Sequence, residues 1–342
     1  MRAPLGTLLL VLGVALSAQA DRVKLRAQAG YSFNMPVLGE NIAYVRDVLE
    51  AGGRDDLHVQ VYDANKLVPT LQIFDAVRTG KIDAGFAWPV YWMGKLPAAT
   101  VFGAVPFGPD ASEYLAWMHQ GGGLELWREI YARHGLVPIP CGVLPPEASG
   151  WFAYPIESEE DLRGLKIRFA GLGGEVLKRL GASVTMLASA DIFPSLERGV
   201  IDATEYSMPA VDRSLGFYKI AKHYYFPGWH QPSSILELIV NKAKWDSLSP
   251  AQQSSIEMAC NAGTLWTLTR GIAIQAEAVE FFEAEGVTLH RWPPELLERF
   301  RAVSDEVMTE YSESDPDFRR AWESLQAFRR RNARWSELAY PE

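Results

Sequence analysis

Four side chains in the middle of this chain have the types that bind a small organic anion together with a cation. Arg168 ends the predicted strand 165–169, and its planar guanidinium fits the two oxygens of a carboxylate. Glu147, Glu205 and Gln231 carry side-chain oxygens, which hard cations such as Na⁺ and Ca²⁺ prefer, whereas Zn²⁺ prefers His and Cys. Isolated arginines and scattered glutamates are more often solvated. The interpretation therefore depends on a fold that brings these four side chains together.

Aromatic residues are frequent in the same part of the chain, which is consistent with a lined ligand pocket. Core packing is the alternative for each ring. The residues are Trp88, Tyr91, Trp92, Trp151, Tyr206 and Trp229.

Signatures of catalysis and of nucleotide binding are missing. Gly171, Gly173 and Gly174 precede a helical segment, but no Lys-Ser/Thr pair follows and no G-x-G-x-x-G motif is completed. The six histidines show no H-x-x-x-H or Cys/His spacing, and no G-x-S-x-G elbow is present. Lyase or hydrolase chemistry in a metal cleft remains an alternative, although no general base with a matched partner is visible. These patterns favour ligand capture over chemistry.

An internal repeat supplies elements that could position the four side chains. The segments 73–84 and 192–203 lie 119 residues apart, and both read Ile-Phe, then Gly, then Ile-Asp-Ala. Each predicts an amphipathic helix that ends at a left-handed glycine, followed by a short apolar strand. Because ligands of open α/β sheets bind beyond the carboxyl ends of strands, the repeat predicts two lobes around a cleft. Chance similarity of two helix–strand units is the alternative.

Composition and charge bound the class of protein. A hydrophobic fraction of 48% and a charged fraction of 22% are typical of globular proteins, and 342 residues allow two domains. The net charge of −9 disfavours nucleic acid and anionic membranes as partners. Cys141 and Cys260 either form one disulfide in an oxidising compartment or remain buried thiols.

The N-terminus has the features of a secretory signal peptide. Arg2 precedes an apolar run over 8–16, and Ala18-Gln19-Ala20 offers a small-x-small cleavage site. The run is shorter than the roughly 20 residues that span a bilayer, which disfavours a membrane anchor. We predict a signal peptide over 1–20, cleavage after Ala20 and a mature protein that begins at Asp21.

Strand and helix patterns alternate along the rest of the chain, which predicts parallel sheets. The apolar segment 236–242 is predicted to return to the first lobe, and Ser249-Pro250 to begin a long helix. The Arg- and Trp-rich tail over 318–335 is predicted as a packing helix rather than a nucleic-acid surface. We assign 21–143 and 236–300 to the first lobe, 144–235 to the second, and 301–342 to C-terminal helices that pack on the lobes.

With these residues in view, the chain resembles the periplasmic solute receptors of tripartite ATP-independent periplasmic (TRAP) transporters, of the DctP type, and especially those that bind 2-oxo acids. The resemblance covers nearly everything after the leader and implies an α/β, two-lobed periplasmic binding protein, type II-like, with a cleft between the lobes and long bracing helices. It is carried by Val105-Pro106-Phe107, Gly150-Trp151-Phe152, Gly164-Leu165-Lys166-Ile167-Arg168, Asp191-Ile192-Phe193-Pro194, Ile201-Asp202-Ala203-Thr204-Glu205, Phe226-Pro227-Gly228-Trp229 and Val240-Asn241-Lys242.

The resemblance also implies roles for single residues. Arg168 matches the strand-end arginine that takes the substrate carboxylate. In the 2-oxo-acid branch a cation bridges substrate and protein, which implies bound Na⁺ or Ca²⁺. The matching positions are Glu147, where the family has Gln, Gln231, where it has Glu, Glu205, and the backbone carbonyl of Tyr206, where it has Trp. The first two exchanges compensate each other in charge, so the cation site is retained. The implied substrate contacts are Arg168, Glu147, Tyr206, Tyr91 and Trp88.

The predicted function is the periplasmic substrate-binding subunit of a TRAP transporter, which captures a small 2-oxo or 2-hydroxy carboxylate, passes it to membrane subunits, and is not an enzyme. A dicarboxylate or sugar acid as ligand, and a role as ligand-presenting partner of a sensor, are the alternatives. The 2-oxo-acid receptors continue into a helix exchanged between two subunits, whereas this sequence ends at Glu342. We therefore predict a monomer or a weak dimer.

Overall fold

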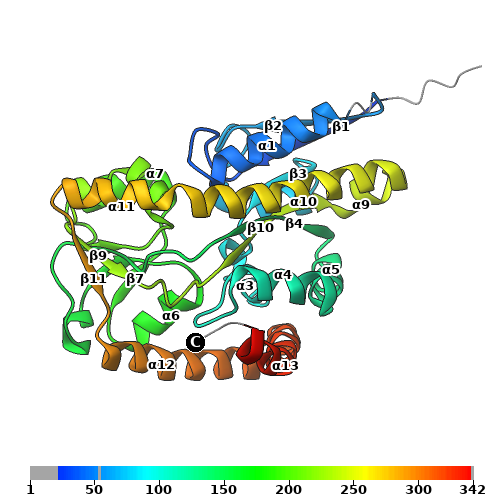
Figure 1. Ribbon diagram of the computed structural model, residues 1–342. Helices are drawn as coiled ribbons and strands as arrows, with labels where there is room; N and C mark the ends of the chain where they lie inside the picture. The colour runs from blue at the N-terminus through cyan, green and yellow to red at the C-terminus, as the bar shows by residue number, and fades with distance from the viewer. Residues whose placement is uncertain (1–21, 53–54, 340–342) are drawn as a thin grey trace, which may run out of the picture.

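Two β-sheets, each packed against helices, form the frame of the molecule (Figure 1). The computed structural model describes residues 22–52 and 55–339, so the predicted signal peptide over 1–20 and its cleavage site lie outside the described residues. The first sheet has the strand order β2-β1-β3-β10-β4, and the second has the order β11-β9-β5-β8-β6-β7. This arrangement confirms the predicted α/β class with two lobes.

The first sheet combines parallel and antiparallel pairs. β1 (Val23–Ala29) pairs in parallel with β2 (Leu57–Tyr62) and β3 (Ala84–Ala87). β10 (Ser234–Asn241) runs antiparallel between β3 and β4 (Leu136–Leu144). The chain leaves this sheet along β4 and returns along β10, so the two crossing strands must run in opposite directions. The predicted return of 236–242 to the first lobe is confirmed, whereas the expectation of parallel sheets was only partly right.

The second sheet is also mixed. β6 (Lys166–Arg168) pairs in parallel with β7 (Ser183–Thr185) and β8 (Ala203–Thr204). β5 (Gly150–Phe152) runs antiparallel to β8 and to β9 (His223–Phe226), and β11 (Thr288–Arg291) adds a parallel edge strand beside β9. Placing all of 236–300 in the first lobe was therefore wrong, because the chain crosses once more before β11. The other domain boundaries remain predictions.

Long helices brace the two sheets. α10 and α11 follow one another across both lobes, and α12 runs beneath them (Figure 1). The predicted start of α10 is confirmed, because the Ser249 hydroxyl accepts the backbone N–H of Gln252, whose side chain accepts the N–H of Ser249. The helices are α1 (Leu38–Ala51), α2 (Ile73–Arg78), α3 (Ala99–Gly103), α4 (Ala111–Gln120), α5 (Gly123–Ala132), α6 (Gly171–Arg179), α7 (Ser189–Glu197), α8 (Pro209–Leu215), α9 (Lys242–Asp246), α10 (Pro250–Ala273), α11 (Gln275–Ala284), α12 (Pro294–Ser314) and α13 (Pro316–Ala339), with 3₁₀ turns η1 (Thr70–Gln72), η2 (Pro89–Trp92), η3 (Glu159–Leu162) and η4 (Phe217–Lys219).

The repeated segments form equivalent units, α2 with β3 and α7 with β8. Gly80 and Gly199, which follow the two helices, have φ angles of 73° and 67°, as the left-handed termination predicted. The strands then enter their sheets beside β1 and β6 respectively. The repeat therefore reflects a common local architecture.

Cys141 in β4 and Cys260 in α10 form a disulfide, which resolves the alternatives that the sequence left open. The bond joins α10 to the first sheet across 119 residues of chain. Among the described residues, no helix combines the length and apolar character needed to cross a bilayer.

Candidate ligand and cation site

A small cavity of about 10 Å³ lies where the ends of both sheets meet the two crossing segments. Part of its wall comes from the first sheet, part from the second, and part from the connections β4–β5 and β9–β10. Six of the seven residues assigned to ligand or cation binding from the sequence line it, and Glu205, the seventh, lies against Arg168. The six are Trp88, Tyr91, Glu147, Arg168, Tyr206 and Gln231.

Arg168 and Glu205 form a buried ion pair at the floor of this cavity. Arg168 is the last residue of β6, and Glu205 directly follows β8, the neighbouring parallel strand. Arg168 Nη1 donates to Glu205 Oε2 at 2.7 Å and to the backbone carbonyl of Glu205. The two side chains are 2% and 1% exposed. Arg168 Nε is buried without a hydrogen-bond partner, so one donor of the guanidinium remains to be satisfied.

Glu147 provides a second buried carboxyl group. It lies on the β4–β5 connection, and its Oε1 accepts a 2.8 Å hydrogen bond from the Ser207 hydroxyl. Burial and the neighbouring charge of Glu205 raise the pKa of Glu147 well above its usual value. Burial also raises the pKa of Glu205, but the charge of Arg168 and several hydrogen bonds outweigh it and hold that pKa below its usual value. Glu147 Oε2 and Glu205 Oε1 are both buried without a hydrogen-bond partner.

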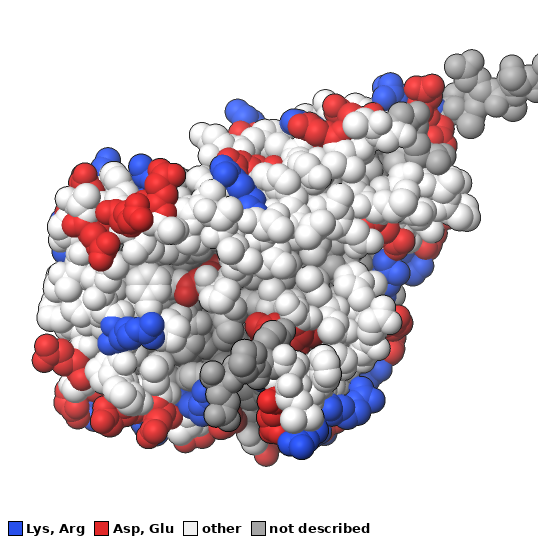
Figure 2. All heavy atoms as spheres, viewed as in Figure 1, with Lys and Arg blue, Asp and Glu red and all other residues white. Residues whose placement is uncertain are grey.

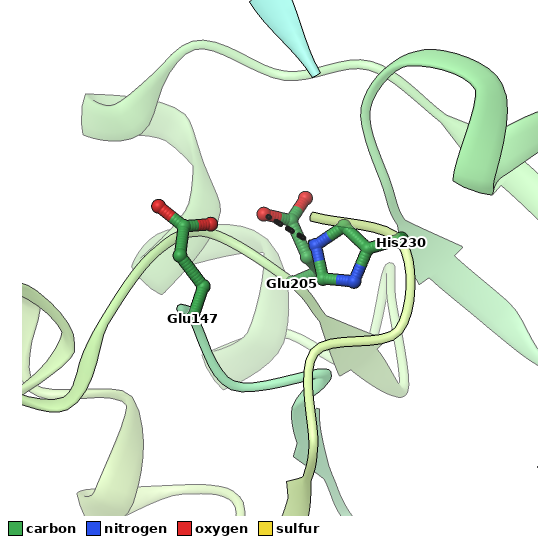
Figure 3. A group of neighbouring side chains, drawn as sticks. All are labelled: Glu147, Glu205 and His230. Atoms are coloured by element: carbon green, nitrogen blue, oxygen red, sulfur yellow. Dashed lines mark ion pairs between the residues drawn. The ribbon is translucent and has the colours of Figure 1, made fainter. Parts of the chain in front are cut away.

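His230 completes a cluster that the sequence patterns did not reveal. One ligand atom each from Glu147, Glu205 and His230 lie within 4.8 Å of one another, and Figure 3 shows a ring nitrogen of His230 facing Glu205. His230 Nε2 is 3.7 Å from Glu205 Oε1, and neither ring nitrogen has a hydrogen-bond partner. Gly173 leaves room for the base of the His230 side chain, because a Cβ there would lie 2.7 Å from His230 Cβ. Only its place beside Gln231 could have indicated His230.

The two crossing segments are held together at Gly228. Its N–H donates to the carbonyl of Glu147 at 3.0 Å, and a Cβ at this position would lie 2.4 Å from the same oxygen. A side chain would therefore separate the segment that carries Glu147 from the one that carries His230 and Gln231. Gln231 is buried and lines the cavity, so its amide lies in the same site as the carboxyl groups.

Aromatic rings close the rest of the cavity. Tyr206 places its ring 5.2 Å from the Arg168 guanidinium carbon. From the first lobe, Trp88 and Tyr91 contact each other edge to face at 5.4 Å, and Tyr31 lies 6.3 Å from Tyr91. Trp88 Nε1 is a further buried donor without a partner. Tyr31, which follows β1, was not predicted, because a tyrosine between a strand and a loop carries no distinctive sequence signal.

The site combines unmatched donors with unmatched acceptors. Buried polar groups are normally hydrogen-bonded, so several unmatched atoms gathered in one place favour a bound partner there. Arg168 Nε and Trp88 Nε1 fit an anion, whereas Glu147 Oε2 and Glu205 Oε1 fit a cation or a donor. The geometry therefore suits an anion and a cation bound side by side.

Comparison with known proteins points the same way. The model of the DctP family, described as bacterial extracellular solute-binding protein, family 7, matches residues 37–315. A monocarboxylate 2-oxoacid-binding periplasmic protein of Nostoc sp. strain PCC 7120 is 36% identical over 82% of this chain and 78% of its own length.

Two solved structures are similar over nearly the whole chain. A TRAP transporter solute-binding protein of Bordetella bronchiseptica RB50, with calcium and picolinate bound in one site of a dimer, is 31% identical over 93% of this chain and 95% of its own, with a TM-score of 0.91. A TRAP periplasmic solute-binding protein of Pseudoalteromonas atlantica T6c, with bound sodium and pyruvate, is 30% identical over 93% and 97%, with a TM-score of 0.89.

Proposed function

This chain belongs to the DctP family of bacterial extracellular solute-binding proteins, and we propose that it captures a small 2-oxo or 2-hydroxy monocarboxylate together with Na⁺ or Ca²⁺. Members of this family are receptors of TRAP transporters, not enzymes. We infer that the mature protein acts in the periplasm after cleavage behind Ala20 and delivers its ligand to membrane subunits.

The observation that carries the proposal is that unmatched donors and unmatched acceptors lie together in and beside one cavity. Arg168 Nε needs an acceptor, and Glu147 Oε2 and Glu205 Oε1 need a cation or a donor. A 2-oxo or 2-hydroxy acid supplies the acceptor through its carboxylate. It can also chelate a cation through one carboxylate oxygen and the 2-oxygen, which a simple carboxylate cannot do. Both requirements are then met by one ligand and one ion.

Charge balance supports the cation. The charges of Arg168 and Glu205 offset each other, so an anionic ligand would leave an excess of negative charge in a buried environment. A cation offsets that excess and replaces the hydration that each group loses. Its proposed ligands are all oxygens, as Na⁺ and Ca²⁺ prefer. They are Glu147, Glu205, the backbone carbonyl of Tyr206 and the side chain of Gln231.

The first lobe contributes uncharged aromatic side chains to the lining of the cavity. Trp88 offers one N–H, and Tyr91 and Tyr31 offer rings and hydroxyl groups. We propose that the ligand binds first to Arg168 and that these rings then close over it, because closure is favoured only by contacts made in the closed state. We expect exclusion of water by the first lobe to add to the affinity.

The test is isothermal titration of the mature protein with pyruvate and lactate, in buffers containing Na⁺, K⁺ with chelator, or Ca²⁺. We expect binding that requires Na⁺ or Ca²⁺. Propionate is the matched control, because it has the same carbon chain without the 2-oxygen and should bind weakly and without cation dependence. Equal affinity for propionate and pyruvate would overturn the chelation geometry. Binding of a dicarboxylate or a sugar acid, with none of any 2-oxo or 2-hydroxy acid, would overturn the substrate class.

A further inference from the structure

The cavity lies closest to solvent at Tyr91. Among the described residues that line it, Tyr91 alone is not buried. Tyr91 also lines a second pocket of about 260 Å³ between the lobes, which we call the outer pocket. Its walls come from η2 and the residues after it in the first lobe, and from the β6–α6 turn, α6 and β7 in the second. The outer pocket is therefore the side from which solvent comes nearest to the cavity.

Arg168 lies between the cavity and the outer pocket. It lines the cavity, and its Nη2 lies 3.9 Å from the sulfur atom of Met186. Met186 is part of the wall of the outer pocket. The two spaces therefore share Tyr91 as a wall and meet beside the residue that we propose binds the ligand carboxylate.

At the outer pocket the two lobes touch through Val90 and Gly171. Val90 lies in η2 of the first lobe, and Gly171 begins α6 of the second. A Cβ at Gly171 would lie 2.5 Å from Val90 Cγ1, which is closer than carbon atoms approach without bonding. Gly171 also has a φ angle of 64°, which favours glycine. Glycine at this position therefore lets the lobes come together as they do.

Val90 is held in place by its own lobe on the opposite side. A Cβ at Gly103, in α3, would lie 2.8 Å from Val90 Cγ2 and 3.3 Å from the backbone nitrogen of Val90. Because valine is branched at Cβ, its side chain has few alternative rotamers. Val90 therefore cannot make room for a larger residue at position 171 unless η2 moves. Figure 2 shows mostly uncharged atoms where the two lobes meet, so this contact depends on shape rather than charge.

We propose that Val90 is a positioning residue that shuts the cavity when it packs against Gly171, and that the ligand passes between η2 and α6 when this contact is broken. This inference rests on the proposed function, because it takes the cavity as the place where the ligand binds. The turn that ends at Gly171 follows Arg168, and within it the N–H of Ala170 donates to Glu205 Oε2 at 3.4 Å. The Val90–Gly171 contact therefore sets how closely the first lobe approaches the residues that bind the ligand.

An engineered disulfide tests whether the ligand passes this contact. Cβ atoms at positions 90 and 171 would lie 3.9 Å apart, within the range of about 3.5–4.5 Å found in disulfides. Both native cysteines are bonded to each other, so the double variant Val90→Cys/Gly171→Cys introduces the only free thiols. Protein oxidised with diamide should no longer take up pyruvate in Na⁺ buffer, and mild reduction should restore uptake. Labelled pyruvate that is bound before oxidation should be retained through gel filtration.

Two outcomes of this experiment would overturn the proposal. Thiols that stay free under diamide would show that the lobes do not meet at Val90 and Gly171. Fully oxidised protein that exchanges pyruvate as fast as reduced protein would show that the ligand takes another route. Thiol titration needs no ligand, so it stays informative if the wild-type protein binds no 2-oxo or 2-hydroxy acid. That result would overturn the proposed ligand alone.

Glycine substitutions give a second test that needs no cross-link. Gly171→Ala should weaken pyruvate binding about tenfold to a hundredfold, because its methyl group does not fit beside Val90. Gly164→Ala is the matched control, since Gly164 in the same lobe has a φ angle of 76° but a Cβ there would meet nothing within 4 Å. Both substitutions should lower the melting temperature, whereas only the first should lower affinity. Adding Val90→Ala to Gly171→Ala removes the clashing methyl group and should restore most of the affinity. Equal losses of affinity at the two glycines, or no recovery in the double variant, would contradict the proposed role of Val90.

Discussion

The two lobes place different side chains at equivalent positions of the same local scaffold. In the first lobe, Asp83 accepts a hydrogen bond from the backbone N–H of Arg26 in the neighbouring strand and donates its own N–H to the carbonyl of Arg26. In the second lobe, Asp202 makes the same two bonds with Lys166. These contacts align the two units in the same register, so residues of β1 and β6 can be compared one by one.

Equivalent positions in β1 and β6 have different roles, one structural and one in binding. Gln28 in β1 is equivalent to Arg168 in β6, since each lies two residues after the partner of the aspartate. The Gln28 amide is used by backbone groups, with bonds to the carbonyls of Ala29 and Asp63 and from the N–H of Leu67. Arg168 keeps one buried donor unmatched. A side chain whose hydrogen-bonding groups are all used within its lobe stabilises that lobe. A side chain that keeps an unmatched donor can bind a ligand.

Truncation of Arg168 and of Gln28 should have the largest effects, on ligand affinity in the first case and on stability in the second. Arg168→Ala should weaken ligand binding tenfold to a thousandfold, because a buried charge-assisted contact is worth about 1.5–4 kcal/mol. Gln28→Ala should lower the melting temperature by removing buried hydrogen bonds, yet leave affinity within about twofold. Titration calorimetry and thermal melts check both variants. Arg168→Lys keeps the charge in case the alanine variant does not fold. Unchanged affinity in both Arg168 variants would remove this residue from the site.

The residues after the repeated strands offer the second test. Glu205 is equivalent to Phe86 in the register of the two sheets. Glu205→Gln preserves shape but removes the carboxylate, so binding should weaken about tenfold to a hundredfold and lose its dependence on Na⁺ or Ca²⁺. Phe86→Leu should cost stability only. Cation dependence that survives in Glu205→Gln would contradict the proposed role of Glu205 as a cation ligand.

A buried carboxyl group of the first sheet should make the stability of the protein depend on pH. Glu237 in β10 accepts from Trp92 Nε1 at 2.5 Å but has no cationic partner, and burial raises its pKa to about 8. Between the unfolded pKa near 4.5 and that value, the folded state holds a proton that the unfolded state has released. The free energy of unfolding should therefore fall as pH rises through this window, by up to about 1.4 kcal/mol per pH unit.

Glu237→Gln isolates this contribution, because glutamine keeps the acceptor and does not titrate. Its stability should fall less steeply from pH 5 to pH 8, so the variant gains on the wild type as pH rises. Asp212 in the second lobe, whose pKa burial raises to about 7, leaves some slope in both proteins. Urea denaturation at several pH values measures the difference. Parallel pH profiles would show that Glu237 is ionised in the folded state.

The paired aspartates provide the smallest and most specific comparison. Asp83→Ala and Asp202→Ala each remove one acceptor for a backbone N–H and should cost about 1 kcal/mol of stability. Only Asp202→Ala should also weaken ligand binding, by a few-fold, because Asp202 aligns the strand that ends at Arg168. Equal effects of the two variants on affinity would show that alignment of this strand does not matter to the site.

Much of the architecture could be predicted from local patterns. The return of 236–242 to the first lobe, the helix start at Ser249 and the left-handed glycines at 80 and 199 agree with the structure. The antiparallel insertion of β10 and the edge strand β11 could not be predicted, because a strand's partners depend on where the chain crosses between lobes. Of the site, Arg168, Glu147, Glu205 and Gln231 were singled out, and the structure brings them together. His230 and Tyr31 were missed.

The difference between what could and could not be predicted from the sequence has a physical reason. Helix caps, glycine turns and apolar periods act over a few residues, so the amino-acid sequence by itself determined the helix–glycine–strand units and which side chains end their strands. The site depends on groups far apart in the chain, such as the Arg168–Glu205 pair, 37 residues apart, and the Glu147–Ser207 bond, 60 residues apart. Tertiary packing decides which polar atoms have no hydrogen-bond partner after those contacts form. Only the tertiary structure decided that unmatched atoms of Arg168, Glu147 and Glu205 gather in and beside one cavity.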